Sequence, residues 1–123
     1  MVSNRHLIAE LFFAIDDRDA YRFSEFLSQD CLFRFGNGQS ITGKNAVHDV
    51  VESFFHSIAA LSHEITEFIE TENQVVCHGL VTYTRLDNSV LTVPFANIFK
   101  MTQHKITEYL IFVDISNLYQ RQS

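Results

Sequence analysis

Residues 75–115 read VVCHGLVTYTRLDNSVLTVPFANIFKMTQHKITEYLIFVDI, and this stretch decides the fold. Apolar and β-branched side chains recur along it with a period of two, which is typical of β-strands. Two polar dipeptides interrupt the pattern, Asp87-Asn88 and Gln103-His104. Asp and Asn both tolerate positive φ and suit a two-residue hairpin loop. The stretch therefore predicts three consecutive antiparallel strands over residues 75–85, 90–101 and 106–115.

The chain before this stretch changes from a helical to a strand-like period. Apolar residues at i, i+3 and i+4 spacing predict helices over residues 4–17 and 44–61, with a short helix starting after Asp19 between them. Short strands are expected at 31–35 and around Ile41, and a longer one at 65–70. Helices followed by a run of antiparallel strands predict an α+β fold, with three helices packed on one face of a curved antiparallel sheet.

Length and composition bound the possible functions. The 123 residues suffice for one domain, 46% of them are hydrophobic, and the net charge of −6 disfavours nucleic acid as a partner. No stretch is long and apolar enough to predict a membrane span or a secretory signal. Cys31 and Cys77 match no zinc spacing and are interpreted as buried thiols, so we expect a soluble, cytoplasmic protein without a metal.

The two predicted loops fix a register for the last three strands. Pairing across them places one set of side chains on a common face, which we expect to look toward the helices and form a cavity wall. That predicted inner set is Val76, His78, Leu80, Val93, Phe95, Asn97, Phe99, Leu110, Phe112 and Asp114. The other face, with residues such as Cys77, Val81 and Tyr109, is also apolar. An apolar sheet face is expected to be shielded from water by another layer of protein. We therefore expect a homodimer in which a second copy of the chain packs against this outer face of the sheet.

Several motifs resemble those of SnoaL-like members of the NTF2-like superfamily. They are residues 81–87, Val93-Pro94-Phe95-Ala96-Asn97-Ile98-Phe99, residues 105–109 and Val113-Asp114-Ile115, together with residues 26–31 and Thr42-Gly43-Lys44 in the first half. The resemblance covers nearly the whole chain. It implies one domain over residues 1–123, a cone-shaped fold with a pocket for a small apolar molecule, and chemistry without a cofactor. It does not fix the reaction, because one fold hosts many functions.

Asp114, His78 and Asn97 are the candidate catalytic residues. Asp114 ends an apolar strand, where burial would raise the pKa of its carboxyl and allow it to act as a general acid/base near neutral pH. The resemblance implies the same, since SnoaL-like cyclases place a catalytic Asp there. A strand-end Asp bonded to the backbone is the alternative interpretation. His78 could move a proton and Asn97 could bind a carbonyl oxygen, or the two could simply satisfy each other.

Aromatic residues are the candidate ligand-binding groups, since apolar sites are walled with them. We add His63, which begins a strand after the third helix and could instead interact with the last carbonyls of that helix. The predicted ligand-binding residues are Phe12, Phe35, Phe54, Phe95, Phe99, Phe112 and His63.

Two related chemistries fit less well. Arg85 and Asp87 resemble the arrangement of limonene epoxide hydrolase, but Asp87 is expected in a hairpin turn. The catalytic residues of ketosteroid isomerases fall near positions 11–12, 35 and 96–97 of this chain, and none keeps its family identity. Two functions stay open: a cofactor-independent cyclase, isomerase or hydrolase that uses Asp114 on a carbonyl compound, and a non-catalytic ligand-binding or dimerisation module.

Overall fold

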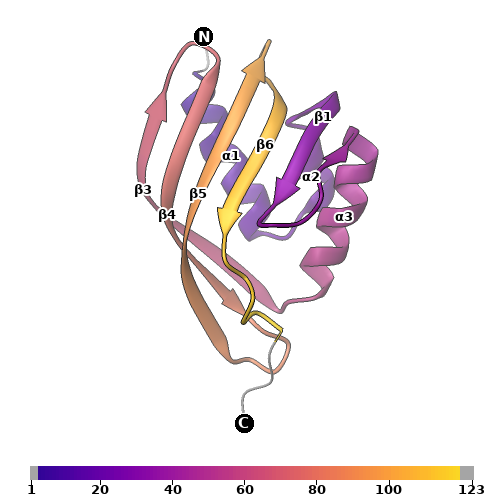
Figure 1. Cartoon of the computed structure of the whole chain (residues 1–123), viewed down its shortest axis with the longest axis vertical. Helices are drawn as coiled ribbons and strands as arrows, with labels where there is room; N and C mark the ends of the chain where they lie inside the picture. The colour runs from indigo at the N-terminus through magenta and orange to yellow at the C-terminus, as the bar shows by residue number, and fades with distance from the viewer. Residues whose placement is uncertain (1–2, 120–123) are drawn as a thin grey trace.

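Three helices and six strands make up residues 3–119, which are the residues that this computed structural model describes (Figure 1). The helices are α1 (Asn4–Asp16), α2 (Ala20–Ser24) and α3 (Lys44–His56). The strands are β1 (Leu27–Phe35), β2 (Ile41–Thr42), β3 (Ala60–Glu70), β4 (Gln74–Thr84), β5 (Val90–Thr102) and β6 (Lys105–Val113).

The strands form one curved sheet in the order β2-β1-β6-β5-β4-β3. Neighbouring strands are antiparallel except β1 and β6, which pair in parallel and make the sheet mixed. The helices lie on one side of this sheet, with α1 behind β4 and β5 and α3 beside β1 (Figure 1). The predicted α+β fold class is confirmed, and the parallel pair is its one departure from a fully antiparallel sheet.

Local interactions explain where the helices begin and end. The Ser3 hydroxyl accepts a hydrogen bond from the His6 backbone N–H at 3.1 Å and caps α1. At the end of α3, the Arg18 guanidinium donates to the carbonyl oxygens of Phe55 and Ile58 at 3.2 and 3.0 Å. Arg18 thus binds one carbonyl in the last turn of α3 and one just beyond it; α3 ends at His56, and the predicted end at residue 61 is wrong.

The first hairpin loop differs from its prediction. Thr84 pairs with Val90, and the Arg85 backbone N–H donates a further bond to the Ser89 carbonyl at 2.8 Å. Three residues therefore form the loop, and the last of them, Asn88, has a φ of 72°. A turn followed by one residue in the left-handed region is the usual three-residue hairpin. The prediction of a two-residue loop at Asp87-Asn88 is wrong, and β4 is displaced by one residue against β5.

The second hairpin loop is confirmed, yet β6 is displaced as well. Gln103 and His104 both have positive φ, and Thr102 pairs with Lys105 as expected. The register then shifts between Lys100 and Met101 because β6 contains one extra residue, Thr107, whose hydroxyl donates to the Lys100 carbonyl at 3.2 Å.

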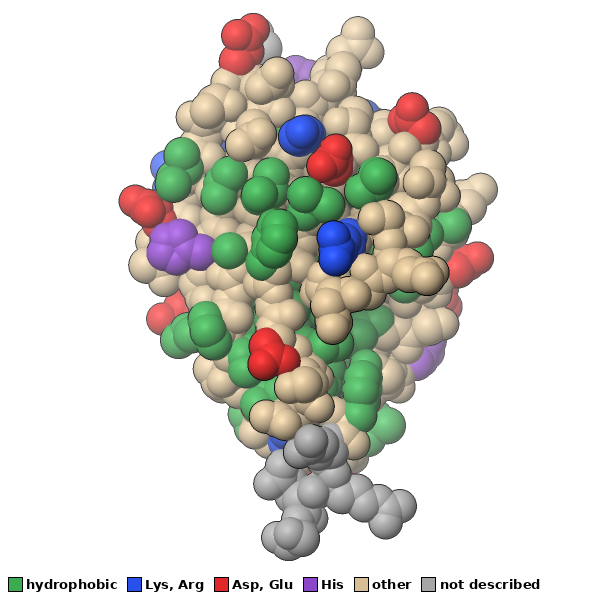
Figure 2. Space-filling view, in the orientation of Figure 1, with side chains coloured by type: hydrophobic (Ala, Val, Ile, Leu, Met, Phe, Trp, Pro, Cys, Tyr) green, Lys and Arg blue, Asp and Glu red, His purple; other side chains and the backbone are tan. Residues whose placement is uncertain are grey.

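These two displacements exchange the faces of β4 and β6 while β5 keeps its predicted orientation. The inner face carries Val75, Cys77, Gly79, Val81, Tyr83, Val93, Phe95, Asn97, Phe99, Tyr109, Ile111 and Val113. The outer face carries Val76, His78, Leu80, Pro94, Ala96, Ile98, Leu110 and Phe112. Figure 2 shows hydrophobic side chains gathered in a band across this outer face. The predicted inward orientation of Val76, His78, Leu80, Leu110 and Phe112 is wrong.

Candidate functional site

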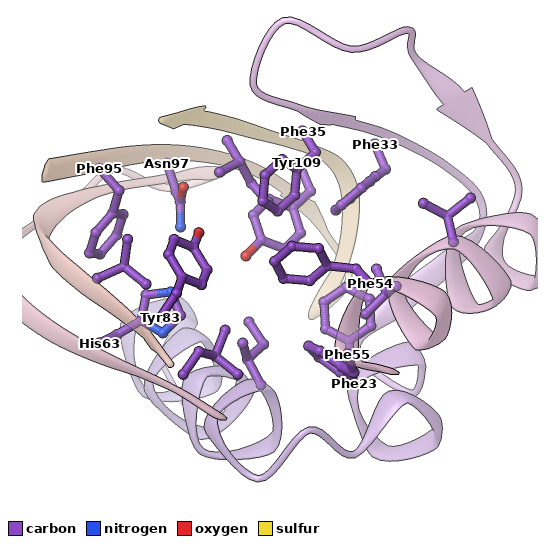
Figure 3. Close-up of a pocket in the computed structure, with 16 residues that line it drawn as sticks. Phe23, Phe33, Phe35, Phe54, Phe55, His63, Tyr83, Phe95, Asn97 and Tyr109 are labelled. Atoms are coloured by element: carbon purple, nitrogen blue, oxygen red, sulfur yellow. The ribbon is translucent and has the colours of Figure 1, made fainter. Parts of the chain in front are cut away.

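A cavity of about 130 Å³ lies between the inner face of the sheet and the helices (Figure 3). Phenyl rings from β1, α2 and α3 form one part of its wall, and side chains from β3, β4, β5 and β6 form the other. The lining residues are Ile15, Phe23, Phe33, Phe35, Val50, Val51, Phe54, Phe55, Leu61, His63, Val81, Tyr83, Phe95, Asn97, Tyr109 and Ile111. A small apolar molecule is the kind of ligand that such a wall suits.

Four of these lining residues are polar: His63, Tyr83, Asn97 and Tyr109. They come from four adjacent strands, β3, β4, β5 and β6. Figure 3 shows the Asn97 amide and the Tyr83 and Tyr109 hydroxyls directed toward the same part of the cavity, with the His63 ring beside Tyr83. The cavity thus has a polar part within an otherwise apolar wall, and this arrangement orients a ligand that carries one polar group.

His63 is held by Asp16, the last residue of α1. Its Nδ1 lies 2.7 Å from Asp16 Oδ1, and its backbone N–H donates to Asp16 Oδ2 at 3.1 Å. A carboxylate that is ionised only accepts hydrogen bonds, so the contact selects the tautomer with the proton on Nδ1, and in the neutral form of that tautomer Nε2 carries the lone pair. The His63 ring packs against Phe12 and Phe95, with ring centroids 4.8 and 5.1 Å away, and its side chain is only 10% exposed.

Asn97 carries a buried amide oxygen that has no partner in the described part of the chain. The residue is 1% exposed, and its Oδ1 has no hydrogen-bond partner among residues 3–119. Leaving a buried polar atom unpaired costs about 1–3 kcal/mol. A rotation of the amide can present either its oxygen or its NH₂ group to the cavity, because the two ends occupy nearly the same positions. A ligand O–H or N–H group that donates to Oδ1 would remove the cost, and a ligand oxygen can instead accept from the NH₂ group.

Burial keeps both cavity tyrosines protonated. Desolvation raises the pKa of the Tyr83 hydroxyl, and the nearby Tyr119 adds to the effect. Desolvation also raises the pKa of Tyr109 well above its ordinary value, with further contributions from Cys77, Tyr83 and Asp16. Neutral phenols can donate hydrogen bonds, so both hydroxyls are available as donors at any physiological pH.

Asp114 does not lie in the cavity. It follows β6, its side chain is exposed, and its Oδ1 accepts from the Ser116 backbone N–H at 2.9 Å. This bond and one from the Ser116 side chain lower the pKa of the Asp114 carboxyl. The predictions that Asp114 points inward and that its pKa is raised are therefore wrong. The physical reason is the extra residue in β6, which turns Asp114 to the outer face.

His78 is also outside the cavity. It is exposed on the outer face, where it lies opposite Ala96, and its Nε2 lies 3.4 Å from Glu67 Oε1. The predicted pair of His78 and Asn97 is wrong, because Cys77 is the residue opposite Asn97. Of the three candidate catalytic residues, only Asn97 lines the cavity.

The predicted ligand-binding residues divide into three groups. Phe35, Phe54, Phe95 and His63 line the cavity. Phe12 and Phe99 are buried behind the wall, where Phe12 packs on His63 and the Phe99 ring lies 4.3 Å from that of Tyr109. Phe112 is 53% exposed on the outer face, so its predicted place in the cavity wall is wrong.

Sequence reasoning missed Asp16, Tyr83 and Tyr109. Both tyrosines fall on the outer face of the predicted register: the missed three-residue loop misplaces Tyr83, and the missed extra residue in β6 misplaces Tyr109. Asp16 lies four residues after Phe12, on the same side of α1. This spacing is the one sequence signal that could have indicated that Asp16 lies beside a residue that packs against Phe12.

Arg85 and Asp87 have structural roles. Arg85 is 7% exposed, and its guanidinium donates to the carbonyl oxygens of Leu118 and Asn117 at 2.8 and 3.0 Å. Asp87 accepts from the backbone and the hydroxyl of Ser89 within the hairpin loop. These two side chains therefore do not form a shared site in the cavity.

Comparisons with known proteins agree with this architecture. A family model described as "SnoaL-like domain" matches residues 8–109. No curated protein matches the chain. Within residues 3–119, no helix has the length and apolar character needed to cross a membrane.

Solved structures with low sequence identity share the fold. An NTF2-like protein of unknown function from Burkholderia pseudomallei superposes with a TM-score of 0.85 at 18% identity, over 96% of this chain and 95% of that one. A candidate SnoaL-like polyketide cyclase from Shewanella putrefaciens gives 0.81 at 16% identity, over 96% and 84% of the two chains. TerC, co-crystallised with polyporic acid, gives 0.80 at 20% identity, over 94% and 95%.

Proposed function

The chain belongs to the SnoaL-like domain family, and from this premise we propose that its cavity catalyses proton transfer on a small carbonyl compound, as a cyclase or isomerase does. The observation that carries the proposal is the 2.7 Å contact between Asp16 and His63, which holds an imidazole in the wall of an apolar cavity. Family members whose structures resemble this one include a candidate polyketide cyclase, which supports chemistry of this class.

His63 is the proposed general base. Its Nε2 takes a proton from the carbon next to the carbonyl group of the ligand. The electron pair of that C–H bond forms a C=C bond, and the π electrons of the carbonyl move to its oxygen, which becomes an enolate. Asp16 fixes the imidazole in the correct tautomer and stabilises the imidazolium that forms. No electron acceptor or cofactor is needed for this step.

Asn97, Tyr83 and Tyr109 are the proposed partners of the enolate oxygen. The Asn97 NH₂ group and the two hydroxyls supply hydrogen bonds in a cavity with few other polar groups, where such bonds stabilise developing charge strongly. In a ligand with a C=C bond next to the deprotonated carbon, the enolate is a dienolate, and the imidazolium returns its proton to the far carbon of that C=C bond. The double bond thereby moves into conjugation with the re-formed carbonyl group, which isomerises the ligand. The overall reaction moves one proton and leaves the oxidation state unchanged.

Deuterium exchange tests the proposal directly. We expect the wild-type protein to accelerate exchange of the protons next to the carbonyl of 2-cyclohexenone and cyclohexanone in D₂O, followed by proton NMR. His63→Gln should lose about 10²–10⁴-fold in rate, which is the usual contribution of a general base. Asp114→Asn is the matched control and should keep the wild-type rate, because Asp114 lies outside the cavity.

An unchanged rate in His63→Gln would contradict the proposed base. If the ketones bind without any exchange, the second function left open by the sequence is favoured, a binding module that uses the same cavity without turnover.

We also propose that a second copy of the chain covers the outer face of the sheet. Leu80 and Phe112 are 43% and 53% exposed there, among further apolar side chains such as Val76, Pro94 and Ile98. Exposed apolar patches of this kind mark interaction sites. Light scattering should give a dimer at micromolar concentration and a monomer for Phe112→Glu. A monomeric wild-type protein would contradict this proposal without affecting the cavity chemistry.

A further inference from the structure

We propose that the cavity admits a ligand with one six-membered ring, and that the Phe54 side chain excludes a second fused ring. The inference rests on the proposed function for the polar end of the ligand, where a carbonyl, enol or phenol oxygen meets Asn97. It adds the size and the shape of the substrate, which neither the family nor the fold specifies.

The volume of the cavity limits the ligand. Its interior, which opens toward solvent beside the 41% exposed Val50, has room for about 130 Å³. For comparison, an engineered protein cavity of about 150 Å³ lined by aliphatic and aromatic side chains holds one benzene molecule. A single ring with one oxygen substituent therefore fills the space, and a fused two-ring system does not fit without a change in the wall.

Phe54 occupies the position that decides this limit. It projects from α3 toward the middle of the cavity (Figure 3). Its ring centroid lies 5.0 Å from that of Phe35 on β1, 5.9 Å from that of Tyr83 on β4, and 6.3 Å from that of Phe55. The Phe54 ring thus reaches from α3 to β1 and β4. Its removal would add the volume of the ring to the cavity.

The site of Phe54 is suited to control specificity at a small cost in stability. Phe54 is only partly buried, whereas Phe55 is 5% exposed and belongs to the core. Val50, one turn earlier on the same side of α3, also lines the cavity and is 41% exposed. This part of α3 therefore separates the cavity from solvent, and a smaller side chain at position 54 enlarges the cavity without opening the centre of the core.

Titration with phenol and 1-naphthol tests the inference, with the shift of the Asn97 side-chain amide in ¹⁵N–¹H NMR spectra as the readout. Phenol is a stable planar analogue of a cyclic enol. The wild-type protein should bind phenol and should bind 1-naphthol at least tenfold more weakly. Phe54→Ala should bind 1-naphthol at least tenfold more tightly than the wild type does. Phe13→Ala, which removes a 60% exposed phenyl from α1 outside the cavity, is the matched control and should change neither affinity.

Each outcome decides the inference. Equal affinity of the wild type for both probes, no phenol binding at the Asn97 amide, or no gain in 1-naphthol affinity in Phe54→Ala would overturn it. If Phe54→Ala does not fold by circular dichroism, Phe54→Leu removes less volume and should show the same order of affinities. The two tests are independent: ring selectivity without deuterium exchange would reject the proposed function alone, and exchange without ring selectivity would reject this inference alone.

Discussion

The Asp16 carboxylate accepts two hydrogen bonds from His63, one from the backbone N–H at 3.1 Å and one from Nδ1 at 2.7 Å. The first bond ties the C-terminal end of α1 to β3. The second fixes the imidazole that lines the cavity. A single side chain thus links the position of a helix with the tautomer of a candidate catalytic group, and a change in it should affect stability and chemistry together.

The Asp16→Asn variant allows the effect on stability and the effect on chemistry to be measured separately. The amide keeps one oxygen acceptor but loses the negative charge that favours Nδ1–H, so we expect the free energy of unfolding in urea to fall by about 1 kcal/mol. Deuterium exchange into the ketones should fall by about 10²-fold, because the imidazolium loses its stabilising partner. A variant that loses stability but retains the wild-type exchange rate would show that the contact between Asp16 and His63 is structural only.

The Asp114 carboxyl should titrate below its ordinary value of 3.8. The Ser116 backbone N–H and hydroxyl both favour the ionised form, and the carboxyl is exposed to water. An NMR titration of its side-chain carbon should show this. Because the pKa in the folded protein is lowered, the stabilisation is present at neutral pH and is lost as the pH falls through that value. A titration midpoint of the Asp114 carboxyl above pH 5 would contradict its exposed position and would make Asp114 a candidate general acid/base again.

Cys31 and Cys77 should be unreactive in the folded protein. Burial raises the pKa of each thiol to about 12, and the charges of Asp30 and Glu108 add to the effect at Cys31. At pH 8 the thiolate is therefore scarce, and both sulfur atoms are shielded from solvent. Labelling with iodoacetamide should proceed slowly in buffer and rapidly in urea, as followed by mass spectrometry. Rapid labelling of either thiol in the native protein would contradict this.

The same thiols predict a loss of stability in alkali. The unfolded chain releases these protons near pH 9, and the folded protein holds them until about pH 12. A raised pKa in the folded state means that the stabilisation is complete below pH 9 and is lost as the pH rises toward 12. Urea midpoints measured from pH 8 to 10.5 should fall, and a double variant with Ala at positions 31 and 77 should show a smaller fall.

Arg85 should contribute strongly to stability without contributing to chemistry. Its guanidinium bonds to the carbonyl oxygens of Leu118 and Asn117 and to the Ser89 hydroxyl, and the 1% exposed Leu118 packs into the core beside it. Arg85→Met would leave these acceptors unpaired, and we expect a loss of about 2–4 kcal/mol in the free energy of unfolding. Arg34→Met is the control, since Arg34 is exposed and makes one bond, to the Gly38 carbonyl. Equal losses in the two variants would contradict the role of Arg85.

The fold could be predicted because its signals are periodic and local. Helical spacing around Leu11 and Phe12 and the alternation along residues 90–101 each repeat several times, so a single irregular residue does not hide them. Phe95 and Asn97 were placed correctly for this reason, since β5 lies between the two displaced strands and both predicted loops agreed on its orientation.

The site could be predicted only in part, because it depends on single backbone irregularities and on one contact distant in sequence. Two irregularities each displace a strand by one position: the three-residue loop ending at Asn88 and the extra residue Thr107. No pattern of side chains in the sequence indicates either of them. Asp16 and His63 are 47 residues apart, and only the packing of α1 on the edge of the sheet brings them together.

The extra residue in β6 also has an evolutionary consequence. If Thr107 paired regularly instead of forming an extra residue, the register from the confirmed loop would continue unbroken, and Leu110 and Phe112 would replace Tyr109 and Ile111 on the inner face, with Asp114 following on the same side. The Tyr109 phenol would then turn away from the cavity, and the Asp114 carboxylate would turn to the side of the sheet that faces it. The presence of one bulge thus decides which of two sets of side chains forms the interior for the same amino-acid sequence, so that related proteins are best matched by strand parity rather than by aligned letters.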